Sequence, residues 1–336
     1  MRKTFVHHDG ALGDVLLSLP ALDVIREAPG VVHFAGRPDI ADLLKNAGYV
    51  EETSPADSAL FLSLYAEDID ERAGEFLAGF GRAFVFTMKG DSPLAGSIGK
   101  VVPDTKTVLA VPPGGSRVHL AEFRLRQLAP DRDSCRDAHL AVPAVYRERA
   151  RQFLADAAGR DTASALDAGR PLIVLHPGSG GAIKCWPLER FLGLIGRLEE
   201  EYDPVLLILS GPAESPEWKE SIRRFARGRG ATVHAEGVEL ITVAALLDMS
   251  SLYIGNDSGI THLAAAAGGN VVAVFGPTDP ALWRPCGSRV SVLLPKAACA
   301  PCEPLMRGNS DCGMECLYGI SEERVFEACK SRLSTG

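Results

Sequence analysis

Short apolar runs alternate along the chain with longer segments in which apolar residues recur every three or four positions. The first run, KTFVHH (3–8), precedes a glycine turn and the amphipathic segment DVLLSLPALDVIREA (14–28). The same order recurs at residues 31–48, 82–102 and 105–130. Short apolar runs predict buried strands, and three-to-four spacing predicts amphipathic helices. Their regular alternation indicates βα units around a parallel sheet.

A second series of the same units occupies the other half of the chain. It follows a predicted helix at 144–158 and a polar segment of small residues, RDTASALDAGR (160–170), which we predict to be a linker. It then runs from PLIVLHPGSG (171–180) to NVVAVFGPTDP (270–280) through apolar strands and helices in turn. The sequence therefore predicts an α/β protein with two Rossmann-like, doubly wound parallel-sheet domains. In such domains ligands bind at the carboxyl ends of the strands.

Composition and charge narrow the class of protein. A chain of 336 residues is too long for one ordinary core, so we expect two domains, at residues 1–160 and 161–320. The net charge of −8 disfavours a nucleic-acid partner. No apolar run reaches the roughly 18 residues of a membrane span, and polar residues 7–9 interrupt any secretory leader. Eight cysteines are too few for a disulfide scaffold, which favours a cytoplasmic location.

Polar loops follow the apolar strands of the second half at four places: residues 177–184, 211–214, 257–262 and 275–280. Because parallel strands end at one edge of a sheet, we expect these loops to lie together. Glycines let backbone N–H groups approach an anion, and Ser258-Gly259 begins a helix whose dipole favours negative charge. Lys184 adds a positive charge, and Glu214 suits ribose hydroxyls. The combination predicts a site for a nucleotide diphosphate.

Each loop by itself has a simpler explanation. A glycine turn between strand and helix is ordinary βα geometry, Asp257 can cap the helix that follows it, and His262 can be a packed histidine. The segment HPGSGGAIKCWP (176–187) is not a Walker loop, because glycine does not precede its lysine and neither serine nor threonine follows it. The turn GALG (10–13) lacks the G-x-G-x-x-G order, so a dehydrogenase is disfavoured.

Three stretches carry a resemblance to one enzyme family: GALGDVLLSLPAL (10–22), HPGSGGAIKCWPLERF (176–191) and GNDSGITHLAAAAGGNVVAVFGPTDP (255–280). In order and spacing they are similar to the signatures of the heptosyltransferase-type glycosyltransferases of family 9. The resemblance implies a GT-B fold, two Rossmann-like domains facing a central cleft, with the nucleotide sugar held by the C-terminal one. It also implies inverting, metal-independent transfer of a heptose or related sugar from an ADP-sugar to a lipopolysaccharide inner core or similar saccharide.

The resemblance also implies roles for individual residues. It makes Asp14 the catalytic carboxylate, and an inverting transfer needs such a base for the acceptor hydroxyl. The donor-binding residues that it implies are Ser179, Gly180, Lys184, Glu214, Asp257, Ser258, Gly259 and His262. The alternative for Asp14 is a helix cap, because a helix N-terminus stabilises the ionised carboxylate and weakens it as a base. Leu17 and Cys185 stand where many members carry histidine and a basic residue, which weakens any claim to one acceptor.

The acceptor side is expected on the N-terminal domain. Lys89, Arg124 and Arg126 are the candidates for binding an anionic saccharide, each with an exposed strand or helix end as the alternative. By analogy with GT-B proteins, we expect residues 321–336 to form a helix that packs back on the N-terminal domain. A lipopolysaccharide-type acceptor implies peripheral contact with the cytoplasmic face of the inner membrane.

Metal ligation is considered at two places. The segments 68–70 and 131–133 match the Asp-x-Asp of metal-dependent transferases, but neither follows an apolar strand, so we interpret both as surface charge. No cofactor is expected to be required, because Lys184 and a helix dipole can neutralise a diphosphate. A structural zinc site, with reduced thiols as the alternative, is considered at four closely spaced cysteines: Cys299, Cys302, Cys312 and Cys316.

Two other functions stay open. The chain could be another GT-B enzyme, either a hexosyltransferase or a nucleotide-sugar epimerase, although an epimerase would need further acid and base groups besides Asp14. It could also be a protein that binds a nucleotide sugar without turnover.

Overall fold

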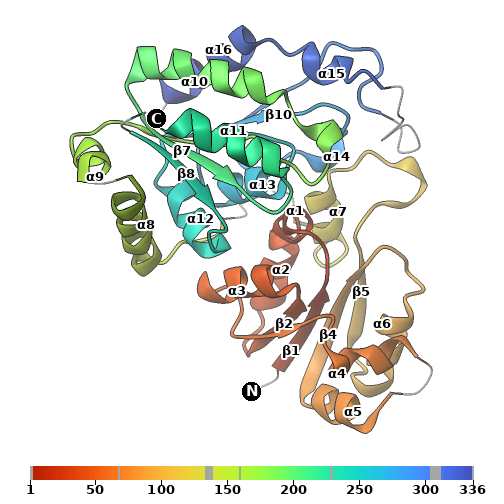
Figure 1. Cartoon of the computed structure of the whole chain (residues 1–336). Coiled ribbons are helices and arrows are strands. Elements are labelled where there is room, and N and C mark those ends of the chain that lie inside the picture. Colours follow the sequence, from red (N-terminus) through yellow and green to blue (C-terminus); the bar gives the residue numbers. More distant parts are fainter. Residues whose placement is uncertain are drawn as a thin grey trace. The chain divides into compact units, whose positions relative to one another are not determined.

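The structure is a computed structural model that describes residues 3–66, 69–132, 139–158, 160–227, 229, 231–302 and 312–334. The chain divides into two compact units, Met1–Ala141 and Val142–Gly336. Helices and strands alternate through both units, as the sequence predicted (Figure 1). Within the described ranges, no helix combines the length and apolar character needed to cross a membrane.

The N-terminal unit is built on a parallel five-stranded sheet of order β3-β2-β1-β4-β5. Its strands are β1 (Lys3–His8), β2 (Val32–Gly36), β3 (Glu52–Pro55), β4 (Phe80–Thr87) and β5 (Thr105–Leu109). Its α-helices are α1 (Leu12–Leu16), α2 (Leu19–Arg26), α3 (Pro38–Asn46), α4 (Ala59–Leu62), α5 (Glu71–Ala78), α6 (Pro93–Val101) and α7 (Leu120–Arg126). The central strand β1 is buried beyond its first residue, because sheets of this kind are covered on both faces.

Aromatic packing anchors β1 in this unit. The ring centroid of Phe5 lies 5.8 Å from that of Phe61 and 5.3 Å from that of Phe80. All three belong to one buried cluster that also takes in residues of α5 and α6. Both pairs are tilted, and ring contacts of this kind stabilise the unit beyond the apolar area that the rings bury. The end of β1, and the glycine turn that follows it, are thereby held in place.

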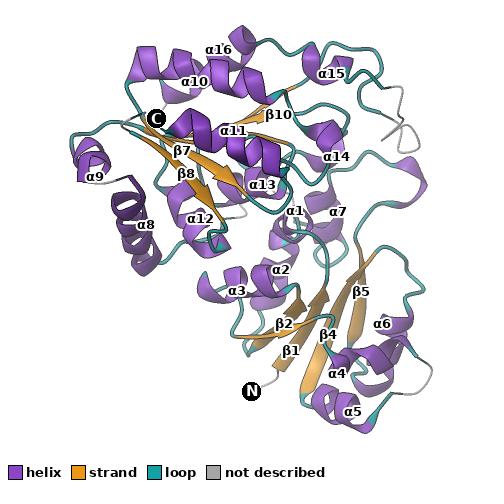
Figure 2. Cartoon of the chain, viewed as in Figure 1, coloured by secondary structure: helices purple, strands orange, loops and turns teal. Residues whose placement is uncertain are grey.

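The C-terminal unit contains a parallel six-stranded sheet of order β11-β10-β9-β6-β7-β8. Its strands are β6 (Leu172–His176), β7 (Val205–Ser210), β8 (Thr232–Glu236), β9 (Leu252–Asn256), β10 (Val271–Val274) and β11 (Val290–Leu293). Its α-helices are α8 (Ala144–Ala158), α9 (Arg160–Asp167), α10 (Leu188–Tyr202), α11 (Pro216–Ala226), α12 (Leu240–Asp248), α13 (Gly259–Ala266), α14 (Pro280–Trp283), α15 (Glu315–Tyr318) and α16 (Glu322–Leu333). Figure 2 shows helices on both sides of these strands.

The order of the strands decides where the polar loops meet. β6, the first strand of the unit, lies between β7 and β9, so the direction of winding reverses beside it. The loops after β6, β7 and β9 therefore leave the same edge at neighbouring positions, with the loop after β10 next to them. This reversal is the usual ligand-binding position in doubly wound sheets. The predicted convergence of the four loops is confirmed.

The boundary between the units differs from the predicted one at residue 160. The units meet at 141 and 142, because α8 packs against α12 and belongs to the C-terminal unit. The predicted linker, 160–170, is largely the helix α9, which packs against α8. Thr162 and Ala165, three positions apart, are buried on one face of α9. The small side chains allow this close packing. The same small, polar composition led us to predict a loop at 160–170.

The C-terminal helix α16 lies in the C-terminal unit. It packs against α10, β9 and β10, and its buried residues Val325, Phe326 and Cys329 join the core of that unit. A Cβ atom on Gly193 of α10 would come within 2.7 Å of the Glu322 carboxylate, so the two helices approach closely there. Its apolar face is thus covered within its own unit, and the expected packing on the N-terminal domain stays a prediction.

Candidate functional site

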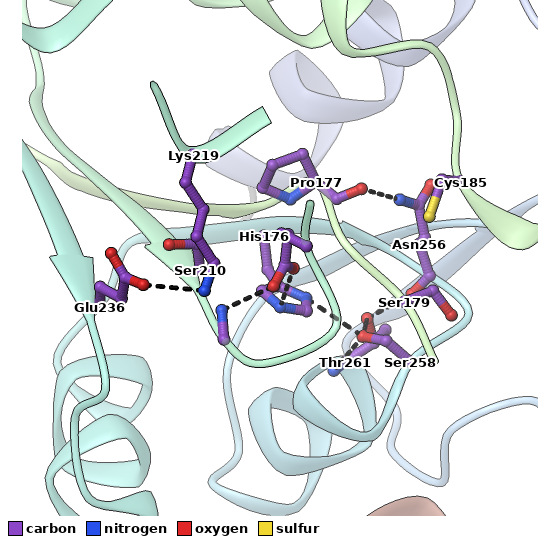
Figure 3. A network of polar contacts seen from close by, with 12 residues as sticks. His176, Pro177, Ser179, Cys185, Ser210, Lys219, Glu236, Asn256, Ser258 and Thr261 are labelled. Atoms are coloured by element: carbon purple, nitrogen blue, oxygen red, sulfur yellow. Dashed lines mark hydrogen bonds and ion pairs between the residues drawn. The ribbon is translucent and has the colours of Figure 1, made fainter. Parts of the chain in front are cut away.

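The loop after β6 is tied at both ends to the end of β9, and Figure 3 shows the bond between Pro177 and Asn256. The side-chain amide of Asn256 donates to the Pro177 carbonyl at 2.6 Å, and its oxygen accepts from the Trp186 backbone N–H at 3.0 Å. Within the loop, the Ser179 hydroxyl donates to the Asp257 carbonyl at 2.6 Å. Since both strands end at the same edge, these bonds hold the loop in a fixed position over the start of α13.

Lys184 forms an ion pair with Asp257 across this edge. Its Nζ lies 2.8 Å from Asp257 Oδ2; the lysine side chain is 31% exposed and the aspartate side chain 7%. The carboxylate therefore holds the ammonium group in place, while the lysine keeps access to solvent. A partly exposed, oriented ammonium group can contact an incoming anion directly.

The N-terminus of α13 lies next to this ion pair. Ser258, rather than Asp257, is the N-cap: its hydroxyl accepts from the Thr261 N–H at 3.3 Å. Gly259 begins the helix, so the positive end of its dipole lies at the loop edge. His262 lies one turn further along and is buried. The alternative that Asp257 merely caps the helix is wrong, because the serine already does so.

Glu214, in the loop after β7, pairs with His176 at the end of β6. Glu214 Oε1 lies 3.1 Å from His176 Nε2, and Oε2 accepts the Gly211 N–H at 2.6 Å. Burial raises the pKa of this carboxyl, but the contacts with His176 and the backbone N–H outweigh it, and the pKa lies below its ordinary value. A Cβ atom on Gly178 would overlap Oε1, at 1.4 Å. Only glycine at 178 leaves room for this charged acceptor.

A cavity of about 480 Å³ opens beside these loops, entirely within the C-terminal unit. Glu214 and Ser179 line its polar side. Trp218 on α11 and Tyr318 on α15 are also among its lining residues. A carboxylate next to aromatic rings is a common lining for a ligand with both a flat apolar part and hydroxyl groups.

Cys185 also lines this cavity and is neutral there. Burial, followed by the charge of Glu214, raises the pKa of its thiol to about 11. The sulfur lies 3.7 Å from the Gly181 carbonyl, to which it donates. A basic residue at this position would add a second cation beside Lys184. With cysteine at this position, this part of the cavity wall carries no charge.

In the N-terminal unit, Asp14 lies in the first turn of α1. The N-cap of that helix is Ala11, and no side chain caps it, so the predicted capping role of Asp14 is wrong. Asp14 Oδ1 instead accepts from Arg124 Nη2 at 3.0 Å. A Cβ atom on Gly10 would come within 2.9 Å of Asp14 Cβ and 2.7 Å of the His8 ring. Glycine at position 10 thus allows the turn to pack against both side chains.

The three predicted acceptor contacts differ in exposure. Arg124 has an exposed fraction of 0%, and its guanidinium is surrounded by hydrogen-bond acceptors of its own unit, so it cannot meet a saccharide at the surface. That prediction is corrected: the helical pattern around Arg124 did not distinguish the buried face of α7 from the exposed one. Arg126 is exposed and paired with Glu122, and Lys89 lies exposed after β4. These two stay candidates.

The four clustered cysteines lie near one another, since burial and then the charges of the other three raise the pKa of Cys316, but the described residues do not gather them as a set of metal ligands. Within the described ranges, no three side chains of His, Cys, Asp or Glu come together as metal ligands. Cys316 is buried in the core, whereas Cys299 and Cys312 are exposed. Asp68 and Asp133, of the two Asp-x-Asp segments, lie outside the described residues. Asp70 caps α5, with its side chain accepting from the Ala73 N–H at 2.7 Å.

Several residues of the site received no role from the sequence, among them Trp218, Tyr318, His176 and Asn256. His176 and Asn256 are the last residues of β6 and β9, and both belong to stretches that drew attention for their glycines. The sequence feature that could have identified both is a polar side chain at the last position of an otherwise apolar strand. That signal is weak without a structure, because a strand end is also where a chain ordinarily returns to solvent.

Trp186 anchors the end of the loop after β6 in the core of the C-terminal unit. It is fully buried, its Nε1 donates to the Ile320 carbonyl at 2.9 Å, and its ring meets Phe191 edge-on at 5.0 Å. Trp186→Phe is expected to lower the free energy of unfolding by about 2 kcal/mol, through the lost hydrogen bond and the smaller ring. Urea denaturation measures this, with Trp283→Phe in the half-buried α14 as the control. Equal stability of both variants would show that Trp186 does not anchor the loop.

Comparison with known proteins agrees with this geometry. The family described as Glycosyltransferase family 9 (heptosyltransferase) matches residues 140–307, half of the chain. Lipopolysaccharide heptosyltransferase 3 of Escherichia coli K12 is 31% identical over 113 residues, which cover 34% of this chain and 33% of that relative. The aligned part thus spans about one third of the relative's length.

Two solved structures resemble the whole chain. The ADP-heptose lipopolysaccharide heptosyltransferase II of Escherichia coli has a TM-score of 0.73 at 17% identity, covering 100% of this chain and 99% of that one. A family 9 glycosyltransferase of Veillonella parvula has a TM-score of 0.75 at 21% identity, covering 100% and 98%. At these identities the likeness concerns the fold, and it confirms the predicted α/β fold of GT-B type. With its second half matched by the family signature and its fold shared with these structures, the protein belongs to glycosyltransferase family 9, the heptosyltransferase family.

Proposed function

We propose that the protein is an inverting glycosyltransferase that moves a heptose or related sugar from an ADP-sugar to a lipopolysaccharide inner-core or similar saccharide. The observation that carries the proposal is the meeting of Lys184, Glu214 and the N-terminus of α13 at one sheet edge, beside the cavity of about 480 Å³. Membership of family 9 selects glycosyl transfer among the reactions that use nucleotide diphosphates. The names of the matched relatives support the choice of a heptose and of lipopolysaccharide.

The donor is proposed to bind in three parts. Its diphosphate lies between Lys184 and the first N–H groups of α13, with Ser179, Gly180 and Ser258 completing the anion site and His262 near the sugar. Its ribose lies against the part of the cavity wall formed by Glu214, whose lowered pKa keeps it ionised. The Glu214 side chain is 0% exposed, so it turns away from His176 to accept a ribose hydroxyl. Its base occupies the cavity, against Trp218 and Tyr318.

The proposed reaction is a single displacement at the anomeric carbon. Asp14 takes the proton of the acceptor hydroxyl as the oxygen forms its bond to that carbon. The bond from the carbon to the diphosphate oxygen breaks at the same time, and the electron pair leaves with the nucleotide diphosphate. Lys184 and the dipole of α13 stabilise the negative charge that develops there. Because this charge is provided by the chain, the step as written uses no metal ion.

The proposed setting is the cytoplasm, at the inner face of the membrane that carries the acceptor. Lys89 and Arg126 are the exposed cations proposed to meet an anionic saccharide. A zinc ion on the four cysteines is not part of the proposed reaction.

A thermal-shift panel with ADP, UDP, GDP and their sugars tests the donor site. At a ligand concentration of about 100 times Kd, binding raises the free energy of unfolding by about 2.7 kcal/mol, which is a melting shift of roughly 5–10 °C. We expect the largest shifts with ADP and ADP-heptose. No shift with any nucleotide would contradict the donor site. Shifts without transfer to any lipopolysaccharide core would instead favour a protein that binds the nucleotide sugar without turnover, and transfer from a UDP-sugar would favour a hexosyltransferase.

A further inference from the structure

Arg124 is a fully buried arginine whose two terminal nitrogens donate to Asp14 and Ser18, in and just after α1. Its Nη2 donates to Asp14 Oδ1 at 3.0 Å, and its Nη1 to the Asp14 carbonyl at 2.5 Å and to the Ser18 hydroxyl at 2.9 Å. Its Nε donates to the Ala110 carbonyl at 3.0 Å. A guanidinium stays charged at any accessible pH and costs several kcal/mol to bury, unless acceptors surround it. Here the acceptors include both the backbone and the carboxylate of Asp14.

His8 extends this set of contacts behind Ser18. The Gly10 N–H donates to His8 Nδ1 at 3.2 Å, so that nitrogen is an acceptor and Nε2 carries the proton of the neutral ring. Nε2 lies 3.0 Å from the Ser18 hydroxyl, which itself donates to the Asp14 carbonyl at 3.0 Å. Burial, and then the charge of Arg124, hold the pKa of His8 well below its ordinary value. The ring is therefore a neutral donor, which is compatible with a buried cation nearby.

The two oxygens of the Asp14 carboxylate are in different environments. Oδ1 is held by Arg124, and within the described residues no hydrogen bond engages Oδ2. The Asp14 side chain is 30% exposed, while that of Arg124 is 0% exposed. One face of the carboxylate is therefore fixed to the interior and the other is open. A base held in this way has its open oxygen in one orientation, which is what proton transfer to a positioned carboxylate requires.

We propose that Arg124 is a positioning residue for the transfer reaction: it fixes Oδ1 of Asp14 and thereby directs Oδ2 to the acceptor hydroxyl. Ser18 and His8 support it by holding the guanidinium and the α1 turn. This assignment rests on the proposed role of Asp14 as the base. It gives Arg124 no contact with either substrate, in contrast to Lys89 and Arg126, the candidates for acceptor binding.

The test compares Arg124→Met with a matched control, Arg82→Met. Arg82 is a partly buried arginine of the same unit, which donates to the Thr4 hydroxyl at 2.7 Å and to the Ile25 carbonyl at 2.5 Å, away from Asp14. Transfer is followed as ADP release from ADP-heptose with a lipopolysaccharide core as acceptor. We expect Arg124→Met to lower kcat by about 10²-fold with little change in the KM of ADP-heptose, since misplacing a reacting group by about 1 Å costs this much. Arg82→Met is expected to keep the wild-type kcat even if its melting temperature is lower than that of the wild type.

A second measurement separates positioning from folding. Repeated in an Asp14→Asn background, Arg124→Met is expected to lower the residual rate by less than about twofold, because residues that act as one unit are not additive. If Arg124→Met does not fold, Arg124→Lys takes its place, because one ammonium group cannot reproduce the forked contacts. A wild-type kcat in the folded Arg124 variant, or a full loss on top of Asp14→Asn, would overturn the proposal. Unchanged transfer by Asp14→Asn alone would instead refute the proposed base.

Discussion

Asp14→Asn is expected to lower kcat for transfer by about 10²–10⁴-fold, the usual contribution of a positioned general base. Asparagine has nearly the same shape, and its side-chain oxygen can still accept the hydrogen bond from Arg124 Nη2, which lies 3.0 Å from Oδ1 in the structure. The substitution therefore removes the ability to take a proton while it leaves the α1 turn intact. Steady-state kinetics with ADP-heptose and a lipopolysaccharide core measure the effect.

Asp39→Asn is the matched control for this substitution. Asp39 also lies in the first turn of a helix that follows a strand, and it pairs at 3.8 Å with Arg37 at the surface. It should retain normal transfer. Calorimetric titration with ADP should give the same Kd for wild type and Asp14→Asn, because the proposed donor contacts all belong to the other unit. A kcat for Asp14→Asn within about twofold of wild type would be incompatible with a role as base.

Lys184→Met is expected to lower kcat/KM for transfer by about 10²–10³-fold, comparable to the loss of one group that stabilises a developing negative charge. The ammonium group is oriented by Asp257 at 2.8 Å and is partly exposed, so it can meet both the bound diphosphate and the diphosphate as it leaves. ADP affinity should fall as well, because the charge attracts the ground state too. Kinetics and calorimetric titration with ADP measure the two effects separately.

The partner of Lys184 complicates this substitution. Methionine at 184 leaves the largely buried Asp257 carboxylate without its ion pair, and its negative charge would then repel a diphosphate. Lys184→Met combined with Asp257→Asn removes both charges, so any loss that persists belongs to the lysine. Lys330→Met is the control, since Lys330 on α16 pairs at 3.3 Å with Glu201 on α10 and is not among the residues that line the cavity. If the double variant transferred at the wild-type rate, Lys184 would have no part in stabilising the leaving group.

Local patterns predicted the elements and the edge of the sheet where we propose the donor site. Apolar runs became strands and three-to-four spacing became helices because both periods follow from the geometry of the backbone itself. Parallel pairing then required the loops holding Lys184, Glu214 and Ser258 to leave one edge. The approach of these residues to one another therefore followed from the order of elements along the chain, without knowledge of any side-chain contact.

The structure was needed to show which side chains pair and which are buried. Asp14 and Arg124 are 110 positions apart along the chain. Nothing in either segment indicates that the Arg124 guanidinium contacts the Asp14 carboxylate. The pairing of His176 with Glu214 and the placement of α16 in its own unit likewise depend on contacts between distant segments. The sequence by itself determined the two doubly wound domains and the convergence of the polar loops at one sheet edge, because these depend on local periodicity and strand order, and its motifs determined the family. Only the tertiary structure decided that Arg124 supports Asp14 from the interior, because burial depends on how the packed elements cover one another.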